Sequence, residues 1–233
     1  MYMRIARTAG FSGLLAALLL TLLQSLWVTP LILHAETFES SAPAVEQPHG
    51  HEAGVAEHHH DSEAWSPEDG WQRLVSTSGA NLVVAVGFAL ILAGLYSLRA
   101  PGRTRDGLLW GLAGFASFSL APSLGLPPEL PGTAAADLVL RQYWWIGTAS
   151  ATAVGLALIA FARPWALRVL GVLVLAVPHL IGAPQPEVHE SLAPAALGEQ
   201  FILASLVTNG LFWLVLGLAS VWFYRRPGAT QAS

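Results

Sequence analysis

One stretch of this chain decides its fold: Phe11-Ser-Gly-Leu-Leu-Ala-Ala-Leu-Leu-Leu-Thr-Leu-Leu-Gln-Ser-Leu-Trp-Val-Thr-Pro-Leu-Ile-Leu33. It carries no charged side chain, and at about 1.5 Å per residue it is long enough to cross about 30 Å of hydrocarbon as a helix. A cleaved signal peptide is the alternative, with an apolar region of about 7–15 residues before a small-x-small cleavage site. Because this run is longer and ends in Leu33-His-Ala35, we expect a retained membrane span.

The composition extends this expectation to the whole chain. Of its 233 residues, 54% are hydrophobic and only 11% are charged, whereas soluble domains carry about 25% charged residues. The chain has no Cys, which excludes disulfides, thiolate metal sites and cysteine nucleophiles. It also has no Lys, which excludes a P-loop, so we expect no nucleotide cofactor and no ATP hydrolysis by that route.

Further apolar runs predict more membrane-spanning helices. We therefore expect an all-α polytopic membrane protein, a single membrane domain over residues 1–233 with about six spans. Polar side chains inside the first run, at Thr21, Gln24 and Ser25, are expected to face other helices rather than lipid. The later spans are expected at 79–98, from 107 to a break at Pro122, at 143–161, at 169–181 and at 201–224.

The charged residues are divided unequally between the two sides of the membrane. An even number of spans puts both termini on one side, and only Arg73 and Arg141 fall on the other. This bias predicts cytoplasmic termini in a cell inner membrane. All acidic residues except Asp106 fall on the outer side, where they would concentrate cations, although simple solubility of the outer loops is the alternative. The arginines on the terminal side are Arg4, Arg7, Arg99, Arg103, Arg105, Arg163, Arg168, Arg225 and Arg226.

A histidine-rich and acid-rich segment is inserted after the first span, and we expect an outer, periplasmic loop over residues 34–76. Gly and Ala separate its polar residues, so it has no apolar face for packing. Imidazole and carboxylate together suit Co²⁺, Ni²⁺, Zn²⁺ or Cu²⁺; a merely soluble polar loop is the alternative. The expected metal ligands in it are His49, His51, His58, His59, His60 and Asp61.

Each outward-going span has a proline near its outer end, at Pro30, Pro122 and Pro178, followed by a carboxylate. This pattern suggests three helical hairpins, and proline-interrupted spans in corresponding positions are typical of transport sites. Proline as ordinary helix punctuation is the alternative. The residues near these outer ends are the candidate ligands of a metal transfer site: His34, Glu36, Glu39, Glu129 and His179.

Each of these candidates has a plainer interpretation. His34, Glu36 and Glu39 would equally suit a solvated helix end, and His179 a hydrogen-bonded core histidine. Arg141 either anchors the membrane interface or bridges to Glu129 or Glu36. An enzyme is not expected, because the chain contains neither His-Glu-x-x-His nor Gly-x-Ser-x-Gly.

Several motifs resemble those of the CbtA family of probable cobalt transporter subunits, and the similarity covers nearly the whole chain. The family is described with five spans where six are counted here. The resemblance implies cobalt uptake for cobalamin synthesis beside a small single-span partner, CbtB, that itself bears histidines. The motifs are Pro30-Leu-Ile-Leu-His-Ala-Glu36 with Glu39, Trp65-Ser-Pro-Glu-Asp-Gly70 with Arg73, Trp110-Gly-Leu-Ala-Gly-Phe115, Leu120-Ala-Pro-Ser-Leu-Gly-Leu-Pro-Pro-Glu-Leu-Pro-Gly132, Arg141-Gln-Tyr-Trp-Trp145 and Pro178-His-Leu-Ile-Gly-Ala-Pro184.

The sequence therefore predicts an inner-membrane subunit for uptake of a divalent metal, cobalt or nickel, captured at the outer face. A membrane accessory protein that binds metal and delivers it to a separate permease is the alternative. Membrane lipid and a CbtB-like subunit are the expected partners, and no nucleic-acid partner is expected.

Overall fold

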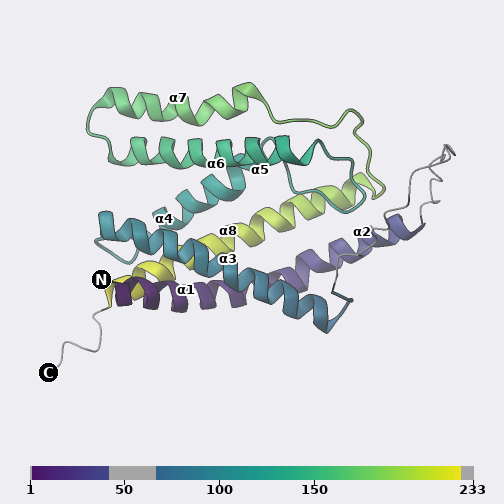
Figure 1. Ribbon diagram of the computed structural model, residues 1–233, viewed down its shortest axis with the longest axis horizontal. Helices are drawn as coiled ribbons and strands as arrows, with labels where there is room; N and C mark the ends of the chain where they lie inside the picture. The colour runs from purple at the N-terminus through teal and green to yellow at the C-terminus, as the bar shows by residue number, and fades with distance from the viewer. Residues whose placement is uncertain (1, 42–66, 227–233) are drawn as a thin grey trace, which may run out of the picture.

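The computed structural model describes residues 2–41 and 67–226, and over these ranges the chain is a bundle of helices without a β-strand (Figure 1). Six helical passes run back and forth along its long axis, which confirms the expected all-α fold. Four of them are long and apolar enough to cross a membrane: Tyr2–Ser41, Trp71–Leu98, Leu138–Phe161 and Ala195–Arg225. The elements are α1 (Tyr2–Leu23), η1 (Gln24–Val28), α2 (Thr29–Ser41), α3 (Trp71–Leu98), α4 (Asp106–Phe115), η2 (Ala116–Leu120), α5 (Ala121–Ser123), α6 (Leu138–Phe161), α7 (Trp165–Ile181) and α8 (Ala195–Arg225).

The bundle has two chemically different ends. We call one the arginine end; it holds the N-terminus of α1, the C-terminus of α8 and the turns at 99–105 and 162–164 (Figure 1). We call the other the acid end; it holds the C-terminus of α2, the N-terminus of α3 and the connections at 124–137 and 182–194. Among the described residues, the arginines other than Arg73 and Arg141 lie at the arginine end, and the acidic residues other than Asp106 lie at the acid end, as the sequence predicted.

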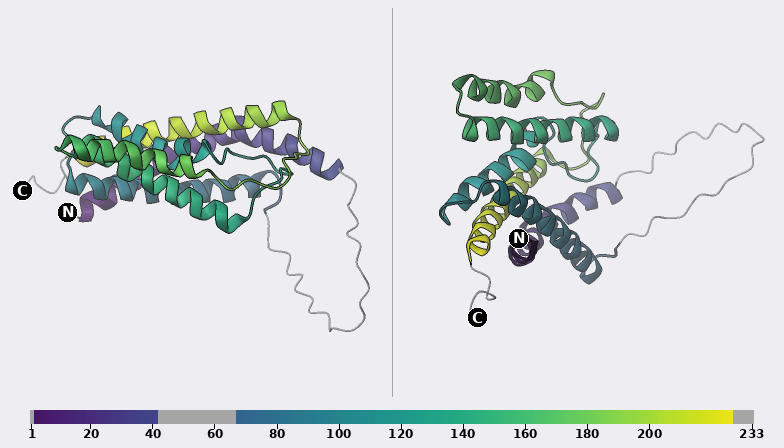
Figure 2. Two further views of the ribbon diagram at one scale, coloured as in Figure 1. Left: turned by 90° about the horizontal axis from the view of Figure 1, so that it is seen from above. Right: turned by 60° about the vertical axis from the view of Figure 1, so that its left-hand side comes forward.

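Helix α8 runs through the middle of the molecule and packs against α1 and α4, while α3 packs along α1 (Figures 1 and 2). Glycines permit the closest of these contacts. A Cβ on Gly107 of α4 would lie 2.6 Å from the carbonyl oxygen of Gly217 on α8, so only glycine allows the two backbones to approach this closely. Close approach through small residues is the usual way in which helices associate without a hydrophobic driving force in lipid.

Helices α6 and α7 form a separate layer, which stands apart from the four-helix core in Figure 1 and in the right view of Figure 2. They cross at Gly155 and Gly171, where a Cβ on either would lie 2.7 Å from the carbonyl oxygen of the other. The outward side of α7 exposes Leu170, Val172 and Leu173, as suits a lipid-facing surface. The three expected hairpins pair consecutive passes: the first with α3, the third with α6, and α7 with α8. The closest packing follows a different pairing, of α1 with α3, of α8 with α1 and α4, and of α6 with α7.

The first and third passes contain π-helical turns, and both turns end two residues before a proline. The backbone N–H of Thr29 donates to the carbonyl of Gln24, and that of Ala121 donates to the carbonyl of Ala116, so the residue before each proline bonds five positions back. The wider turn accommodates a proline that has no N–H of its own.

These turns change the expected picture of broken spans. Pro30 does not interrupt the first pass, which continues as a helix to Ser41. Pro178 likewise lies inside α7 without a π turn. The third pass ends at Ser123, just after Pro122. The helices α2 and α3 also extend into the range 34–76, so the candidate ligands His34, Glu36 and Glu39 are helical.

Polar side chains inside the membrane region bond between helices, as expected for two of the three residues singled out in the first run. The Asn81 side-chain amide on α3 donates to Thr21 Oγ1 at 3.1 Å and to Gln24 Oε1 at 2.7 Å. The expectation was wrong for Ser25, which is exposed. Ser25 belongs to the π turn, where the helix surface is rotated relative to a regular helix.

Candidate functional site

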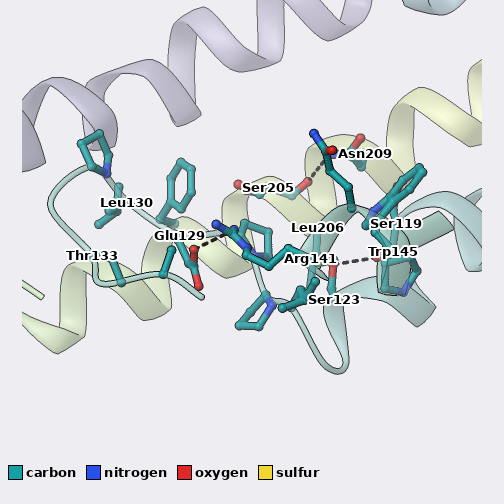
Figure 3. Close-up of a pocket in the computed structure, with 18 of the residues that line it drawn as sticks. Ser119, Ser123, Glu129, Leu130, Thr133, Arg141, Trp145, Ser205, Leu206 and Asn209 are labelled. Atoms are coloured by element: carbon teal, nitrogen blue, oxygen red, sulfur yellow. Dashed lines mark hydrogen bonds and ion pairs between the residues drawn. The ribbon is translucent and has the colours of Figure 1, made fainter. Parts of the chain in front are cut away.

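A cleft of about 1040 Å³ opens where the third pass, α6 and α8 meet (Figure 3). Its walls are the π turn η2, the first half of α6, the middle of α8 and the proline-rich connection after α5. The cleft exists because the α6–α7 layer touches the core mainly through η2 and α5 and leaves the space beside α8 unfilled. Most site residues thus come from the continuous stretch 118–146, and α8 supplies the rest of the cleft from residues 201–209.

The inner part of the cleft holds neutral polar groups. Asn209 lies near the middle of α8 and lines the cleft with Ser205; its side-chain amide donates to the Ser205 carbonyl at 2.9 Å. On the facing wall, the Ser123 hydroxyl donates to the Ser119 carbonyl at 2.6 Å. Hydroxyl and amide oxygens at this depth can replace part of the water around a cation.

Aromatic side chains bound the cleft toward the arginine end. Phe118 and Trp145 line it, with ring centroids 6.2 Å apart. Phe118 also stacks on Trp213 at 5.6 Å and contacts Phe88 at 4.8 Å. This boundary offers no charged group, so the polar face of the cleft is directed toward the acid end.

The proline-rich connection 124–137 forms the outer wall. Leu130 packs against Val28 of η1 and Ala193, Leu197 and Phe201 near the start of α8, in one apolar cluster. Backbone bonds fix its far side: the Ala134 N–H donates to the Glu190 carbonyl, and the Leu192 N–H donates to the Gly132 carbonyl. Gly132 has φ +72°, a conformation that favours glycine at this turn. The wall is therefore an ordered element despite its lack of secondary structure.

Glu129 projects from this wall and pairs with Arg141 of α6, with Arg141 Nη2 2.9 Å from Glu129 Oε2 (Figure 3). Both side chains are less than one-third exposed. Of the two roles expected for Arg141, the structure therefore shows the bridge to Glu129. Both residues of the bridge line the cleft at its acid-end side.

The other acid-end arginine also holds a carboxylate. Arg73 of α3 donates to Glu36 of α2 through two guanidinium nitrogens, at 3.0 and 3.1 Å to Oε1, and its Nε lies 3.0 Å from Asp69. This pair fastens α2 to α3. It lines neither the cleft nor the second cavity described below.

The remaining expected ligands are dispersed. His34 and Glu39 are exposed on α2, and His179 is exposed in the last turn of α7, where its ring lies 6.1 Å from that of Trp144. Over residues 2–41 and 67–226, no group of three or more His, Asp or Glu side chains is placed to hold a metal ion. The five candidates at the outer ends of the spans are thus not brought together here, and their role as ligands stays a prediction.

The expected ligands His49, His51, His58, His59, His60 and Asp61 lie outside the described residues. Among described residues, Ser119 and Ser205 of the cleft were not anticipated from the sequence. Single serines in apolar helices are common in helix packing, so only the nearby Pro122 could have marked Ser119 from the sequence. Asn209 was one of several polar residues that the sequence alone left open as either lining or packing.

Neither a curated protein nor a solved structure matches the chain. A family model, described as "Probable cobalt transporter subunit (CbtA)", matches residues 2–225. That match covers every helix described above, the residues that line the cleft and both acid-end ion pairs. The family's description names a metal, cobalt, as the transported ion. On this evidence, the chain belongs to the CbtA family of probable cobalt transporter subunits.

Proposed function

We propose that this protein takes up a divalent cation across a cell inner membrane, with the acid end outside and both termini in the cytoplasm. Cobalt is the ion that the family description names, and nickel is the other candidate because the same imidazole and carboxylate ligands suit both. The separation of arginine and carboxylate between the two ends supports this orientation, since Lys and Arg are retained on the cytoplasmic side.

The cleft is the observation that carries the proposal. It begins beside Glu129 in the acid-end wall and reaches Asn209, near the middle of α8. From the start of α8 at Ala195 to Asn209 is about 20 Å at 1.5 Å per residue, more than half of a membrane's hydrocarbon thickness. A cation that enters at the acid end would therefore meet oxygen donors well inside the membrane.

Reconstituted protein tests this path directly. We expect radiolabelled Co²⁺ to enter proteoliposomes under a controlled membrane potential, and Asn209→Ala to lower the maximal rate about tenfold, as loss of one well-placed polar contact of about 1.4 kcal/mol would. Asn81→Ala is the matched control: it removes an equivalent amide from the membrane region, away from the cleft. Equal effects of the two changes would show that the amide in the cleft serves only packing. Parallel assays with Ni²⁺ and Zn²⁺ identify the preferred ion.

We assign ion capture to the histidine-rich segment. Alanine in place of His49, His51, His58, His59 and His60 is expected to weaken uptake at scarce metal and leave the maximal rate nearly unchanged. A tethered ligand raises the local ion concentration without forming the path. The measurement is uptake rate against Co²⁺ concentration, and abolished uptake at saturating metal would contradict this role.

One observation favours the alternative of an accessory protein that delivers ions to a separate permease. The described residues contain no three-ligand group, and Glu36 and Glu129 are held by arginines. A small single-span, histidine-bearing subunit of the CbtB kind would then supply the missing ligands or the permease contact. Uptake by the chain alone would exclude the accessory role, whereas uptake that appears only with a separate permease would establish it.

A further inference from the structure

A second cavity, of about 320 Å³, shares the proline-rich wall with the cleft, and we call it the vestibule. It is lined by the wall, by the connection before α8 and by the start of α8, and it contains Gln185, His189 and Glu190. Glu129 and Arg141 line both the vestibule and the cleft. The bridge between them is therefore the charged part of the partition between the two spaces.

The rest of this partition is rigid. Pro127, Pro128 and Pro131 fix backbone angles around Glu129, and the bonds from the wall to Glu190 and Leu192 hold its far side. Arg141 lies one turn into α6, a helix that begins with Asp137 accepting a hydrogen bond from the Leu140 N–H. A side-chain movement at the ion pair requires less rearrangement than displacement of either backbone.

We propose that the Glu129–Arg141 ion pair is a charge-selective barrier between vestibule and cleft, which a divalent cation opens by displacing Arg141 from Glu129. This inference rests on the proposed transport function and adds how ions are selected. Arg141 is then a residue that determines specificity by positioning Glu129, and Glu129 is the group that contacts the ion.

The selection follows from charge. A monovalent cation carries the same charge as the guanidinium but lacks its directed N–H donors, so it does not displace Arg141. A divalent cation doubles the Coulomb attraction to the carboxylate at equal distance. The barrier thus excludes monovalent cations and admits divalent ones on charge alone.

Cysteine labelling measures the barrier without relying on transport, and the chain has no cysteine of its own. Ser205→Cys places a thiol in the cleft, and Ser191→Cys places one in the vestibule as a control for external access. With full-length protein in proteoliposomes, a charged, membrane-impermeant thiol reagent is added at the acid-end side. We expect slow labelling at position 205 and fast labelling at position 191.

Adding Arg141→Gln should accelerate labelling at position 205 about tenfold, the factor that corresponds to loss of about 1.4 kcal/mol of closure. Arg73→Gln is the matched control, since it removes an acid-end ion pair of similar length and exposure that lines neither cavity. The exchange of Glu129→Arg with Arg141→Glu should restore slow labelling, which shows that Arg141→Gln acts through the pair and not through misfolding. Equal labelling with and without Arg141→Gln would overturn the barrier, as would acceleration by Arg73→Gln to the same extent.

Ion flux completes the test. Arg141→Gln vesicles should leak Na⁺ or K⁺ while the parent chain does not, and Co²⁺ uptake should continue in both. If neither chain moves Co²⁺ but labelling still depends on Arg141, the transport proposal fails and the barrier stands. If Co²⁺ enters and Arg141→Gln leaks no monovalent ion, transport stands and the charge-selective barrier is wrong.

Discussion

The four-helix core and the α6–α7 layer use the same kind of contact with different results. In the core, Gly107 of α4 meets Gly217 of α8, and α8 is also packed against α1. In the layer, Gly155 meets Gly171, but α7 has no comparable contact with the core. A close glycine crossing therefore joins two helices in both places. In the core, one helix of the crossing pair, α8, also packs along a third long helix, α1, whereas α7 of the layer packs closely only against α6. The cleft lies between these regions, with α8 of the core on one side and α6 of the layer on the other.

The largest effect is expected from Gly107→Leu. The Cβ alone would lie 2.6 Å from the Gly217 carbonyl oxygen and 2.8 Å from Leu218 Cα, both backbone atoms of the central helix. We expect about 3 kcal/mol or more of destabilisation, which is enough to lose most folded protein. Yield and thermal unfolding in detergent measure it. Gly147→Leu on α6 is the control, because nothing lies within 4 Å of a Cβ there; similar losses from both changes would remove the distinction between core and surface.

Gly155→Leu should have an intermediate effect. It forces α6 and α7 apart, since a Cβ would lie 2.7 Å from the Gly171 carbonyl oxygen, but it leaves the core contacts of α8 intact. We expect a loss of about 1–3 kcal/mol, with a folded core retained. Hydrogen exchange resolved by segment would show faster exchange in α6 and α7 alone. Uniform acceleration that includes α1 and α3 would mean that layer and core unfold as one unit.

The smallest effects are expected from single polar contacts. Asn81→Ala removes two side-chain hydrogen bonds between α1–η1 and α3, and Trp144→Phe removes one 3.3 Å bond from the layer, to the Pro178 carbonyl. Interhelical hydrogen bonds within membranes are worth about 0.6 kcal/mol each on average, so Asn81→Ala should cost about twice as much as Trp144→Phe. Thermal unfolding compares the two. A larger loss from Trp144→Phe would indicate that the layer depends on this bond more than the core depends on its polar contacts.

The sequence predicted the parts of this molecule that charge and hydropathy control. Apolar runs set the number of passes, and the arginine distribution set which connections share an end. Glu129 was one of the two carboxylates, with Glu36, to which the sequence analysis expected Arg141 to bridge. Helix pairing was not predictable, because side chains facing lipid and side chains facing another helix are both apolar, so a buried face leaves no periodic signal.

The candidate site was predictable only in part. Asn209 stood out as a polar residue within an apolar run, and Glu129 as a carboxylate just beyond a span that ends near a proline. The cleft that joins them depends on how far the α6–α7 layer stands from α8. The π turns were missed because Pro30 and Pro122 read as helix breaks. In the structure each proline is accommodated by the turn before it, and the first pass continues to Ser41.

The π turn at Gln24–Val28 has a consequence for how the acid end is oriented. Such a turn usually amounts to one extra residue in an otherwise regular helix, and one residue corresponds to about 100° of rotation. Everything beyond it, including Glu36 that reaches Arg73 on α3, is turned by that angle relative to α1. If the same sequence ran as a regular α-helix through residues 24–28, Glu36 would point about 100° away from its observed direction and would miss Arg73. The partner of Glu36 is therefore decided two turns earlier in the chain, by a local insertion inside the membrane.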